Sequence, residues 1–139
     1  MAEMFVPRFM IAAPNSGSGK TTIVCALLKA LLDQSYKVAA FKSGPDYIDP
    51  MFHSRVIGAK SRNLDLFMLG SETTKYLLAK NASDCDIAVL EGAMGFYDGM
   101  GKTEQYSAYD LARTTKTPVI LVVNGKGAAL SLAAVIKGF

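Results

Sequence analysis

The stretch PNSGSGKTT, residues 14–22, follows an apolar segment and precedes a long segment of helical spacing. It matches the phosphate-binding pattern GxxxxGK[ST], except that Pro14 stands in place of the first glycine. In such a loop successive backbone N–H groups point at a phosphate, and glycines leave room for its approach. The first glycine shapes the entry of the loop, and Pro14 with its fixed φ can make the same turn. The stretch therefore predicts a nucleotide-binding loop.

The residues expected to bind the nucleotide are Asn15, Ser16, Gly17, Ser18, Gly19, Lys20, Thr21 and Thr22. Lys20 would reach the outer phosphates, and the Thr21 hydroxyl would ligate the Mg²⁺ that accompanies them. The alternative is an ordinary glycine-rich turn between a strand and a helix. The apolar segments on both sides favour the phosphate-binding loop, so ATP and Mg²⁺ are the expected cofactors.

Apolar segments of strand length alternate with segments of helix length along the chain, which is typical of a parallel sheet covered by helices. We therefore expect an α/β fold of the P-loop NTPase type, with three α/β/α layers and a mainly parallel sheet. The strands should be buried on both faces, and the first helix should be covered on both sides. The expected strands are 9–13, 38–41, 87–90 and 119–123, and the expected helices are 21–34, 71–81, 106–115 and 128–137.

The composition fits one domain, because half of the 139 residues are apolar. Lysine and arginine number 15 against 12 acidic residues, an excess too small to indicate a nucleic-acid partner. The sequence contains no signal peptide and no apolar run of membrane-spanning length, so a cytoplasmic protein without a membrane partner is expected. Cys25 and Cys85 fit packing positions. The alanine-rich helix near the C-terminus suggests a sheet that is truncated there.

Polar residues follow the expected strands, and an open parallel sheet binds its ligands at the carboxyl ends of its strands. Glu91 ends an apolar strand, where a buried carboxylate is costly unless it holds a cation such as Mg²⁺. A helix-capping or loop carboxylate is the alternative. Lys42, Asp46 and Asp49 lie in a loop that could fold over the phosphates, or that could be a solvated polar turn. His53, the only histidine, fits a surface or packing role as well as a catalytic one.

Two classes of P-loop protein are disfavoured by single stretches of the sequence. The segment NGKG, residues 124–127, lacks the Asn-Lys-x-Asp arrangement that guanine-specific sites use. Asn15 stands where the deviant loop of certain dimeric ATPases carries a lysine.

Four stretches, in chain order, resemble one known family: APNSGSGKTT, FKSGPDYIDPMFH, LEGAMGFYDG and PVILVVNGKGAALSLAAVIKGF. They are similar to the N-terminal synthetase domain of cobyrinate a,c-diamide synthases, which are relatives of dethiobiotin synthetase. The resemblance implies that residues 1–139 are an ATP-binding amidoligase domain. Its substrate would be a corrin or a related tetrapyrrole, whose a- and c-acetate carboxylates are amidated in cobalamin biosynthesis.

The implied reaction consumes ATP with Mg²⁺ and forms an acyl phosphate, which ammonia then displaces. A C-terminal glutamine amidotransferase domain of the same full-length chain, outside these residues, would supply the ammonia. The resemblance leaves room for a homodimer.

On this mechanism the lysines stabilise the phosphoryl oxygens. Asp49 would belong to the metal shell, and Asp98 would orient the substrate carboxylate or the ammonia. The expected metal ligands are Thr21, Asp46 and Glu91, and the expected catalytic residues are Lys20, Lys42, Asp49 and Asp98.

Three other functions remain as alternatives. A dethiobiotin synthetase-like or cobyric acid synthase-like ligase would carry different residues in the GPDYIDP loop. A P-loop ATPase switch protein would be expected to carry lysine at the position of Asn15.

Overall fold

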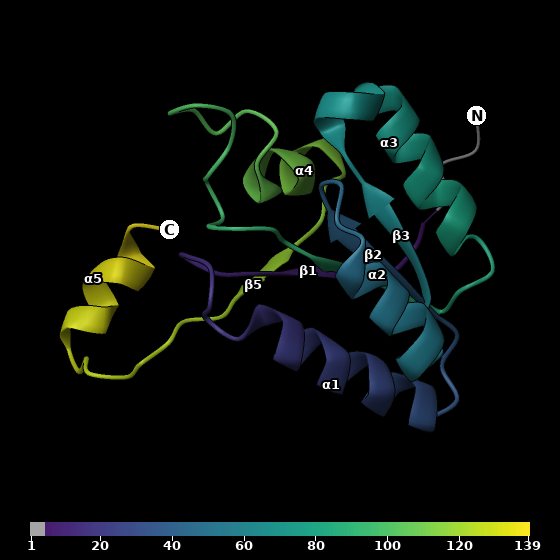
Figure 1. The fold of residues 1–139 in the computed structure, drawn as a ribbon, viewed down its shortest axis with the longest axis horizontal. Helices are drawn as coiled ribbons and strands as arrows, with labels where there is room; N and C mark the ends of the chain where they lie inside the picture. The colour runs from purple at the N-terminus through teal and green to yellow at the C-terminus, as the bar shows by residue number, and fades with distance from the viewer. Residues whose placement is uncertain (1–4) are drawn as a thin grey trace.

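The sheet in the computed structural model, which describes residues 5–139, has five parallel strands in the order β3-β2-β4-β1-β5 (Figure 1). The expected α/β fold with a parallel sheet is confirmed. The strands are β1 (Arg8–Ala12), β2 (Val38–Ser43), β3 (Lys60–Leu64), β4 (Ile87–Glu91) and β5 (Val119–Leu121). Because β2 and β4 pair in register from Val38↔Ile87 to Lys42↔Glu91, the last residues of both strands meet at one edge of the sheet.

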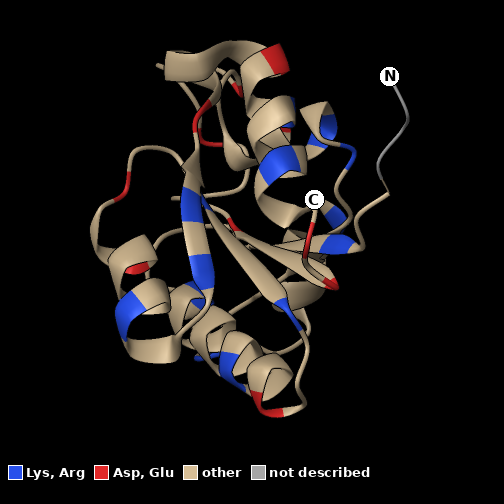
Figure 2. Cartoon of the chain, turned by 90° about the vertical axis from the view of Figure 1, so that its right-hand side faces the viewer, with Lys and Arg blue, Asp and Glu red and all other residues tan. Residues whose placement is uncertain are grey.

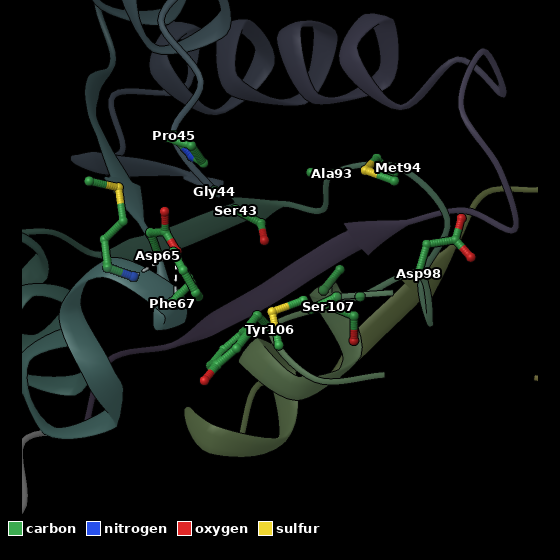
Figure 3. Close-up of a pocket in the computed structure, with 14 residues that line it drawn as sticks. Ser43, Gly44, Pro45, Asp65, Phe67, Ala93, Met94, Asp98, Tyr106 and Ser107 are labelled. Atoms are coloured by element: carbon green, nitrogen blue, oxygen red, sulfur yellow. Dashed lines mark hydrogen bonds between the residues drawn. The ribbon is translucent and has the colours of Figure 1, made fainter. Parts of the chain in front are cut away.

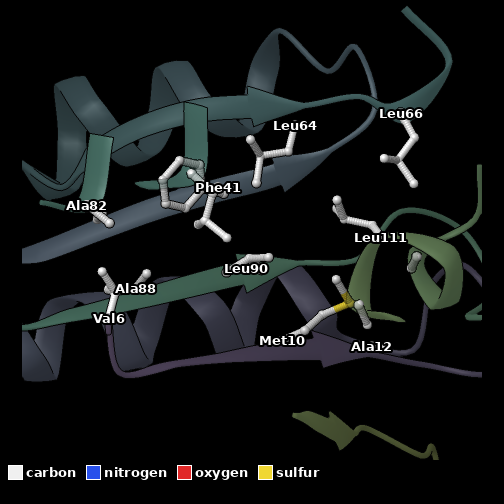
Figure 4. Close-up of a cluster of buried hydrophobic side chains, with 14 of the residues drawn as sticks. Val6, Met10, Ala12, Phe41, Leu64, Leu66, Ala82, Ala88, Leu90 and Leu111 are labelled. Carbon is white, nitrogen blue, oxygen red and sulfur yellow. The ribbon is translucent and has the colours of Figure 1, made fainter. Parts of the chain in front are cut away.

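Helices cover both faces of the sheet. One face carries α1 (Lys20–Asp33), α2 (Ile48–Phe52) and the π-helix η1 (His53–Ile57), and the other carries α3 (Leu66–Ala82) and α4 (Ala108–Thr114). The larger apolar cluster lies under α3 and α4, with Phe41, Leu90 and Met10 at its centre (Figure 4). The sheet is thus clamped between two layers, while its carboxyl edge stays open for a ligand.

Helix α1 buries one side only, so the expectation that it is covered on both sides was wrong. Val24 and Leu28 face the sheet, whereas Ile23, Ala26 and Ala30 are exposed. Helix α1 therefore carries more apolar side chains than residues 5–139 bury.

Strand β5 is more exposed than expected, and helix α5 (Ser131–Lys137) is exposed as well. Val119 and Ile120 are exposed, and α5 has no buried residue. In the described part of the chain β5 pairs only with β1, and α5 lies to one side of the sheet (Figure 1). The expected burial of this strand on both faces is therefore wrong within residues 5–139.

Most of the expected bounds differ from the structure by three residues or fewer, and two segments differ more. The helix expected at 71–81 begins at Leu66 with Asp65 as its N-cap, and it is kinked at Gly70. The loop after β2 was expected to be irregular, yet it forms α2 and η1 from Ile48 onwards. Pro50 is compatible with this helix because it lies in the first turn, where its missing N–H has no partner to lose.

Lysine, arginine, aspartate and glutamate residues are scattered over several helices and strands in the view of Figure 2. Both cysteines are free and partly buried, and Cys85 packs against the larger apolar cluster. Among the described residues, no helix has the length and apolar character that crossing a membrane requires.

Candidate nucleotide-binding site

The phosphate loop joins β1 to α1 in a conformation that needs glycine. Gly17 and Gly19 have φ values of 76° and 95°, a region that residues with a Cβ rarely adopt. Gly19 is the N-cap of α1, so the positive end of the helix dipole faces the loop. The Ser18 hydroxyl lies 2.7 Å from Asn15 Oδ1 and 3.0 Å from the Asn15 carbonyl oxygen, and it donates within the loop. The loop is thus shaped for an anion before one binds.

The segment that follows β4 contacts the phosphate loop at its first residues, Ala13 and Pro14. The Phe96 amide donates to the Ala13 carbonyl at 2.8 Å. A Cβ on Gly95 would lie 2.5 Å from the Pro14 carbonyl oxygen and would also collide with the Asp98 carboxylate. Pro14 therefore takes part in a close backbone approach that requires glycine on the opposite side.

A Gly95→Ala variant should lose about 1–3 kcal/mol of unfolding free energy, because the added methyl group overpacks this approach. Chemical denaturation measures the change. Gly125→Ala is the matched control, since its Cβ would meet only Leu132 Cδ2 at 3.7 Å. Equal stability of the two variants would contradict the close approach.

Glu91, at the end of β4, is contacted by residues from two other elements of the site. Its side chain is fully buried, and its Oε1 accepts hydrogen bonds from Thr21 Oγ1 at 2.6 Å and from Lys42 Nζ at 2.9 Å. Residues from α1, β2 and β4, which lie far apart in the sequence, therefore meet at one carboxylate. The capping alternative for Glu91 does not fit this geometry.

Lys42, at the end of β2, is buried among carboxylates. Its Nζ lies 2.8 Å from Asp49 Oδ2, 2.9 Å from Glu91 Oε1 and 3.9 Å from Asp46 Oδ2. Burial alone would lower the pKa of Lys42, but the hydrogen bonds and charges of Asp49 and Glu91 outweigh it and raise the pKa. Lys42 is therefore a fixed cation at this edge of the sheet.

Lys20, the first residue of α1, points along the phosphate loop. Its Nζ donates to the Met94 carbonyl at 2.8 Å and to the Asn15 carbonyl at 3.3 Å. Burial lowers the pKa of Lys20, the nearby charge of Lys42 lowers it further, and Glu91 and Asp98 partly oppose this effect. A bound phosphate would supply the anionic partner that these neutral carbonyls do not.

The three expected aspartates are placed differently from one another. Asp49 contacts Lys42 directly, whereas Asp46 accepts through Oδ1 from the amides of Ile48 and Asp49 at the start of α2. Asp46 thus caps a helix and turns only its second oxygen toward Lys42. Asp98 is exposed and accepts from the Gly95 amide at 3.1 Å. It does not line the phosphate-side cavity, but it does line the neighbouring pocket.

The site residues enclose a cavity of about 350 Å³ at the carboxyl edge of the sheet. Backbone amides at an α-helix N-terminus and two lysines in one cavity provide the groups that bind phosphates. The lining residues are Ser16, Gly17, Gly19, Lys20, Thr21, Thr22, Lys42, Glu91 and Met94.

The oxygen ligands of this cavity fit Mg²⁺. Among residues 5–139, no group of three or more His, Cys, Asp or Glu side chains is arranged to hold a metal ion. Mg²⁺ bound with a nucleotide needs fewer, because phosphates and waters fill most of its positions and one or two carboxylates suffice. The Thr21 hydroxyl and Glu91 Oε1 touch each other at the phosphate side of the cavity, where such an ion would bind.

A second pocket, of about 540 Å³, lies beside the first, and Met94 lines both. Figure 3 shows it between the end of β2, the start of α3 and the residues that lead into α4. Phe67, Met68, Met100 and Tyr106 give it an apolar wall, and Phe67 packs edge-on against the Tyr106 ring at 5.3 Å. The pocket therefore offers an apolar face next to the phosphate-binding cavity.

His53 is the residue whose place the sequence left undecided. It is completely buried, and its Nε2 lies 3.7 Å from Glu91 Oε2. Burial lowers the pKa of His53, and the Glu91 charge opposes that effect in part. A lone histidine in a polar loop gives no signal of such burial, because the contact depends on η1 folding back against β3 and β4.

Comparison with known proteins places residues 9–124 in the family described as the CobQ/CobB/MinD/ParA nucleotide binding domain. The chain is 52% identical over 136 residues to a cobyrinate a,c-diamide synthase of Thermoplasma volcanium and 46% identical over 135 residues to that of Thermoplasma acidophilum. It is also 46% identical over 135 residues to a hydrogenobyrinate a,c-diamide synthase of Streptomyces coelicolor. These matches cover 98%, 97% and 96% of this chain and 30%, 30% and 28% of the relatives. The chain thus spans less than a third of the length of these relatives.

Proposed function

Because the chain belongs to the CobQ/CobB/MinD/ParA nucleotide binding domain family, we propose that it is the ATP-binding amidoligase domain of a cobyrinate a,c-diamide synthase. The full-length enzyme would convert the a- and c-acetate carboxylates of cobyrinate, or of a related tetrapyrrole, into amides. The observation that carries the ATP-dependent part of the proposal is the buried Glu91, which joins Thr21 of the phosphate loop to Lys42 of the next strand. The names of the relatives carry the choice of substrate.

The chemistry explains why such a reaction needs a phosphate-binding site. A free carboxylate repels nucleophiles and has no good leaving group. In the proposed first step a substrate carboxylate oxygen bonds to the γ-phosphorus while the bond from that phosphorus to the bridging oxygen breaks, which releases ADP. Ammonia then attacks the acyl carbon, phosphate leaves with its electron pair, and the ammonium group loses a proton to give the amide.

The residues of the cavity supply position and charge for the first step. Lys20 would bind the outer phosphates, and Lys42 would neutralise charge that develops on the transferred phosphoryl group. Moving Lys42 toward the phosphate would exchange part of its ion pairs with Asp49 and Glu91 for a new one. Bound Mg²⁺ would supply further charge neutralisation at the phosphates, with Thr21 and Glu91 as its protein ligands and Asp46 or Asp49 within the metal shell.

The second pocket is the proposed place of the substrate. Its apolar wall suits the face of a tetrapyrrole ring, and it adjoins the phosphate-binding cavity at Met94. An acetate side chain at the ring margin could therefore extend toward the γ-phosphate while the ring stays in the pocket. Asp98 lies at the same pocket and is suited to orient the incoming ammonia.

Ammonia would come from glutamine, hydrolysed by a further domain of the full-length chain. This element rests on the family resemblance and on the greater length of the relatives, of which the chain spans about 30%.

A Phe67→Ala variant of the full-length enzyme should raise the KM for the tetrapyrrole about tenfold, because the ring loses an exposed aromatic contact, and leave the KM for ATP unchanged. Steady-state kinetics with each substrate varied in turn measures both constants. Tyr76→Ala, on the same helix but away from the pocket, is the control. A rise in the KM for ATP instead would contradict the assignment.

The function itself is tested by incubating the full-length protein with ATP, Mg²⁺, glutamine and cobyrinate. Mass spectrometry should detect the diamide with two equivalents of ADP, and hydroxylamine in place of glutamine should trap the acyl phosphate as a hydroxamate. ATP turnover stimulated only by a diamine and carbon dioxide would favour a dethiobiotin synthetase-like ligase. Nucleotide-dependent dimerisation with no acid substrate would favour a switch protein.

A further inference from the structure

Two buried polar atoms face each other directly behind the phosphate-binding cavity. His53 Nε2 and Glu91 Oε2 lie 3.7 Å apart, and neither has a hydrogen-bond partner among residues 5–139. Both side chains are 0% exposed, so water does not reach them from the surface. Leaving such atoms unpaired costs about 1–3 kcal/mol each, whereas an approach of roughly 0.8 Å would join them in a hydrogen bond.

We propose that His53 is a positioning residue for Glu91, donating its Nε2–H to Oε2 so that Oε1 stays directed at Thr21 and Lys42. This inference rests on the proposed function only in taking Glu91 as a ligand of the divalent cation. A carboxylate held through one oxygen presents the other in a fixed direction. Hydrogen-bonded partners behind metal ligands orient them in this way, and their loss weakens metal binding.

The surroundings of the imidazole ring favour a proton on Nε2. The Ser61 hydroxyl of β3 is buried and lies 3.4 Å from His53 Nδ1. By donating to Nδ1 it would leave the ring proton on Nε2, opposite the carboxylate. The reverse tautomer would place a lone pair of Nε2 against the Glu91 carboxylate, which is unfavourable because both are acceptors.

The π-helix η1 and strand β3 fix the position of the His53 imidazole ring. His53 begins the π-helix η1, and its carbonyl accepts from the amide of the cap residue Gly58 and from the Ala59 amide at 2.9 Å. Such π-helical turns are rare and occur often at functional sites. Strand β3 in turn places Ser61 beside Ala40 of β2, so the order Ser61, His53, Glu91 runs from the edge of the sheet toward the cavity.

His53 does not line the phosphate-binding cavity, so it acts through Glu91 and not on the phosphates. A packing role alone would require its volume but not its N–H group. The two roles therefore differ in what a donor-free side chain of similar size would do.

Two variants of the full-length enzyme separate these roles. His53→Gln keeps an N–H donor near the position of Nε2, and His53→Met fills similar space without one. We expect His53→Met to weaken Mn²⁺ binding about tenfold or more in the presence of a non-hydrolysable ATP analogue, and His53→Gln to retain most of it. Electron paramagnetic resonance of free Mn²⁺ measures the affinity.

The matching kinetic readout is the Mg²⁺ concentration for half-maximal rate, which should rise in His53→Met while kcat at saturating Mg²⁺ falls less. Thermal melting identifies loss of fold. The proposal is overturned if His53→Met binds Mn²⁺ like the wild type, or if the Met and Gln variants are equally impaired.

The tautomer gives an independent test. In the full-length enzyme labelled with ¹⁵N-histidine, the His53 signals are those missing from the His53→Gln spectrum. We expect Nε2 to be protonated and its shift to change when Mg²⁺ and the ATP analogue bind. An unprotonated Nε2 with the proton on Nδ1 would overturn the proposal. Because neither the Mn²⁺ measurement nor the spectrum requires the tetrapyrrole, both stand even if the enzyme amidates another acid.

Discussion

Replacing Glu91 by glutamine in the full-length enzyme should lower kcat about 100-fold or more. Glutamine keeps the shape of the side chain and an oxygen that can accept from Thr21 and Lys42, but it removes the negative charge. That charge is the one expected to hold the divalent cation of the nucleotide. The residual rate should also need more Mg²⁺ for saturation, which steady-state kinetics at varied Mg²⁺ would show.

The control for this variant is Glu72→Gln, at an exposed glutamate on α3 whose side chain is 86% accessible. It should leave the rate and the Mg²⁺ dependence unchanged. Lys42 keeps its ion pair with Asp49 in the Glu91 variant, so the protein should remain folded. A Glu91→Gln enzyme with normal Mg²⁺-dependent turnover would refute the role of this carboxylate.

Replacing Lys20 by methionine should have the second large effect, a fall of about 100-fold or more in kcat/KM for ATP. Methionine retains the packing of the lysine stem but offers no charge to the phosphates. Within the described part of the chain the Lys20 ammonium group donates to the carbonyls of Asn15 and Met94 alone, so its loss leaves no buried carboxylate there without a partner. The fold should therefore survive while nucleotide affinity falls.

Isothermal titration with a non-hydrolysable ATP analogue measures that affinity directly. The matched control is Lys29→Met, on the exposed side of the same helix, where the lysine side chain is 61% accessible. It should bind the analogue like the wild type. If the Lys20 variant did so too, the phosphate loop would not be where the nucleotide binds.

The parts of this arrangement that could be predicted from the sequence are those governed by local pattern. Gly17 and Gly19 are predicted to leave room for a phosphate, and in the structure both have the positive φ values that glycine adopts readily. The apolar runs that end at Lys42 and Glu91 predict parallel strands whose polar ends lie at one edge of the sheet, because an open parallel sheet binds its ligands there. The register between β2 and β4 then brings these two residues side by side.

Strand β3 could not be predicted in this way because its sequence, KSRNL, is polar. It lies at the edge of the sheet, where Ser61 and Leu64 turn inward and Lys60 and Arg62 are exposed. The position of His53 follows from this strand and from η1. Its contact with Glu91 is therefore a product of tertiary packing.

The predicted burial of α1 and β5 on both sides was wrong for a different reason. Ile23 and Ile120 have apolar side chains, yet both side chains are exposed within residues 5–139. Periodicity states which residues can be buried together, but it does not state whether a second layer is present to bury them.

We propose that one site binds a nucleoside triphosphate together with its cation, through Lys20, Thr21, Lys42 and Glu91. The most direct test is a crystal structure of the full-length protein with Mn²⁺ and a non-hydrolysable ATP analogue, with the metal located by its anomalous signal. We expect one anomalous peak within coordinating distance of Thr21 Oγ1 or Glu91, with the γ-phosphate between Lys20 and Lys42. A nucleotide bound elsewhere, or a metal peak remote from both of these ligands, would contradict it.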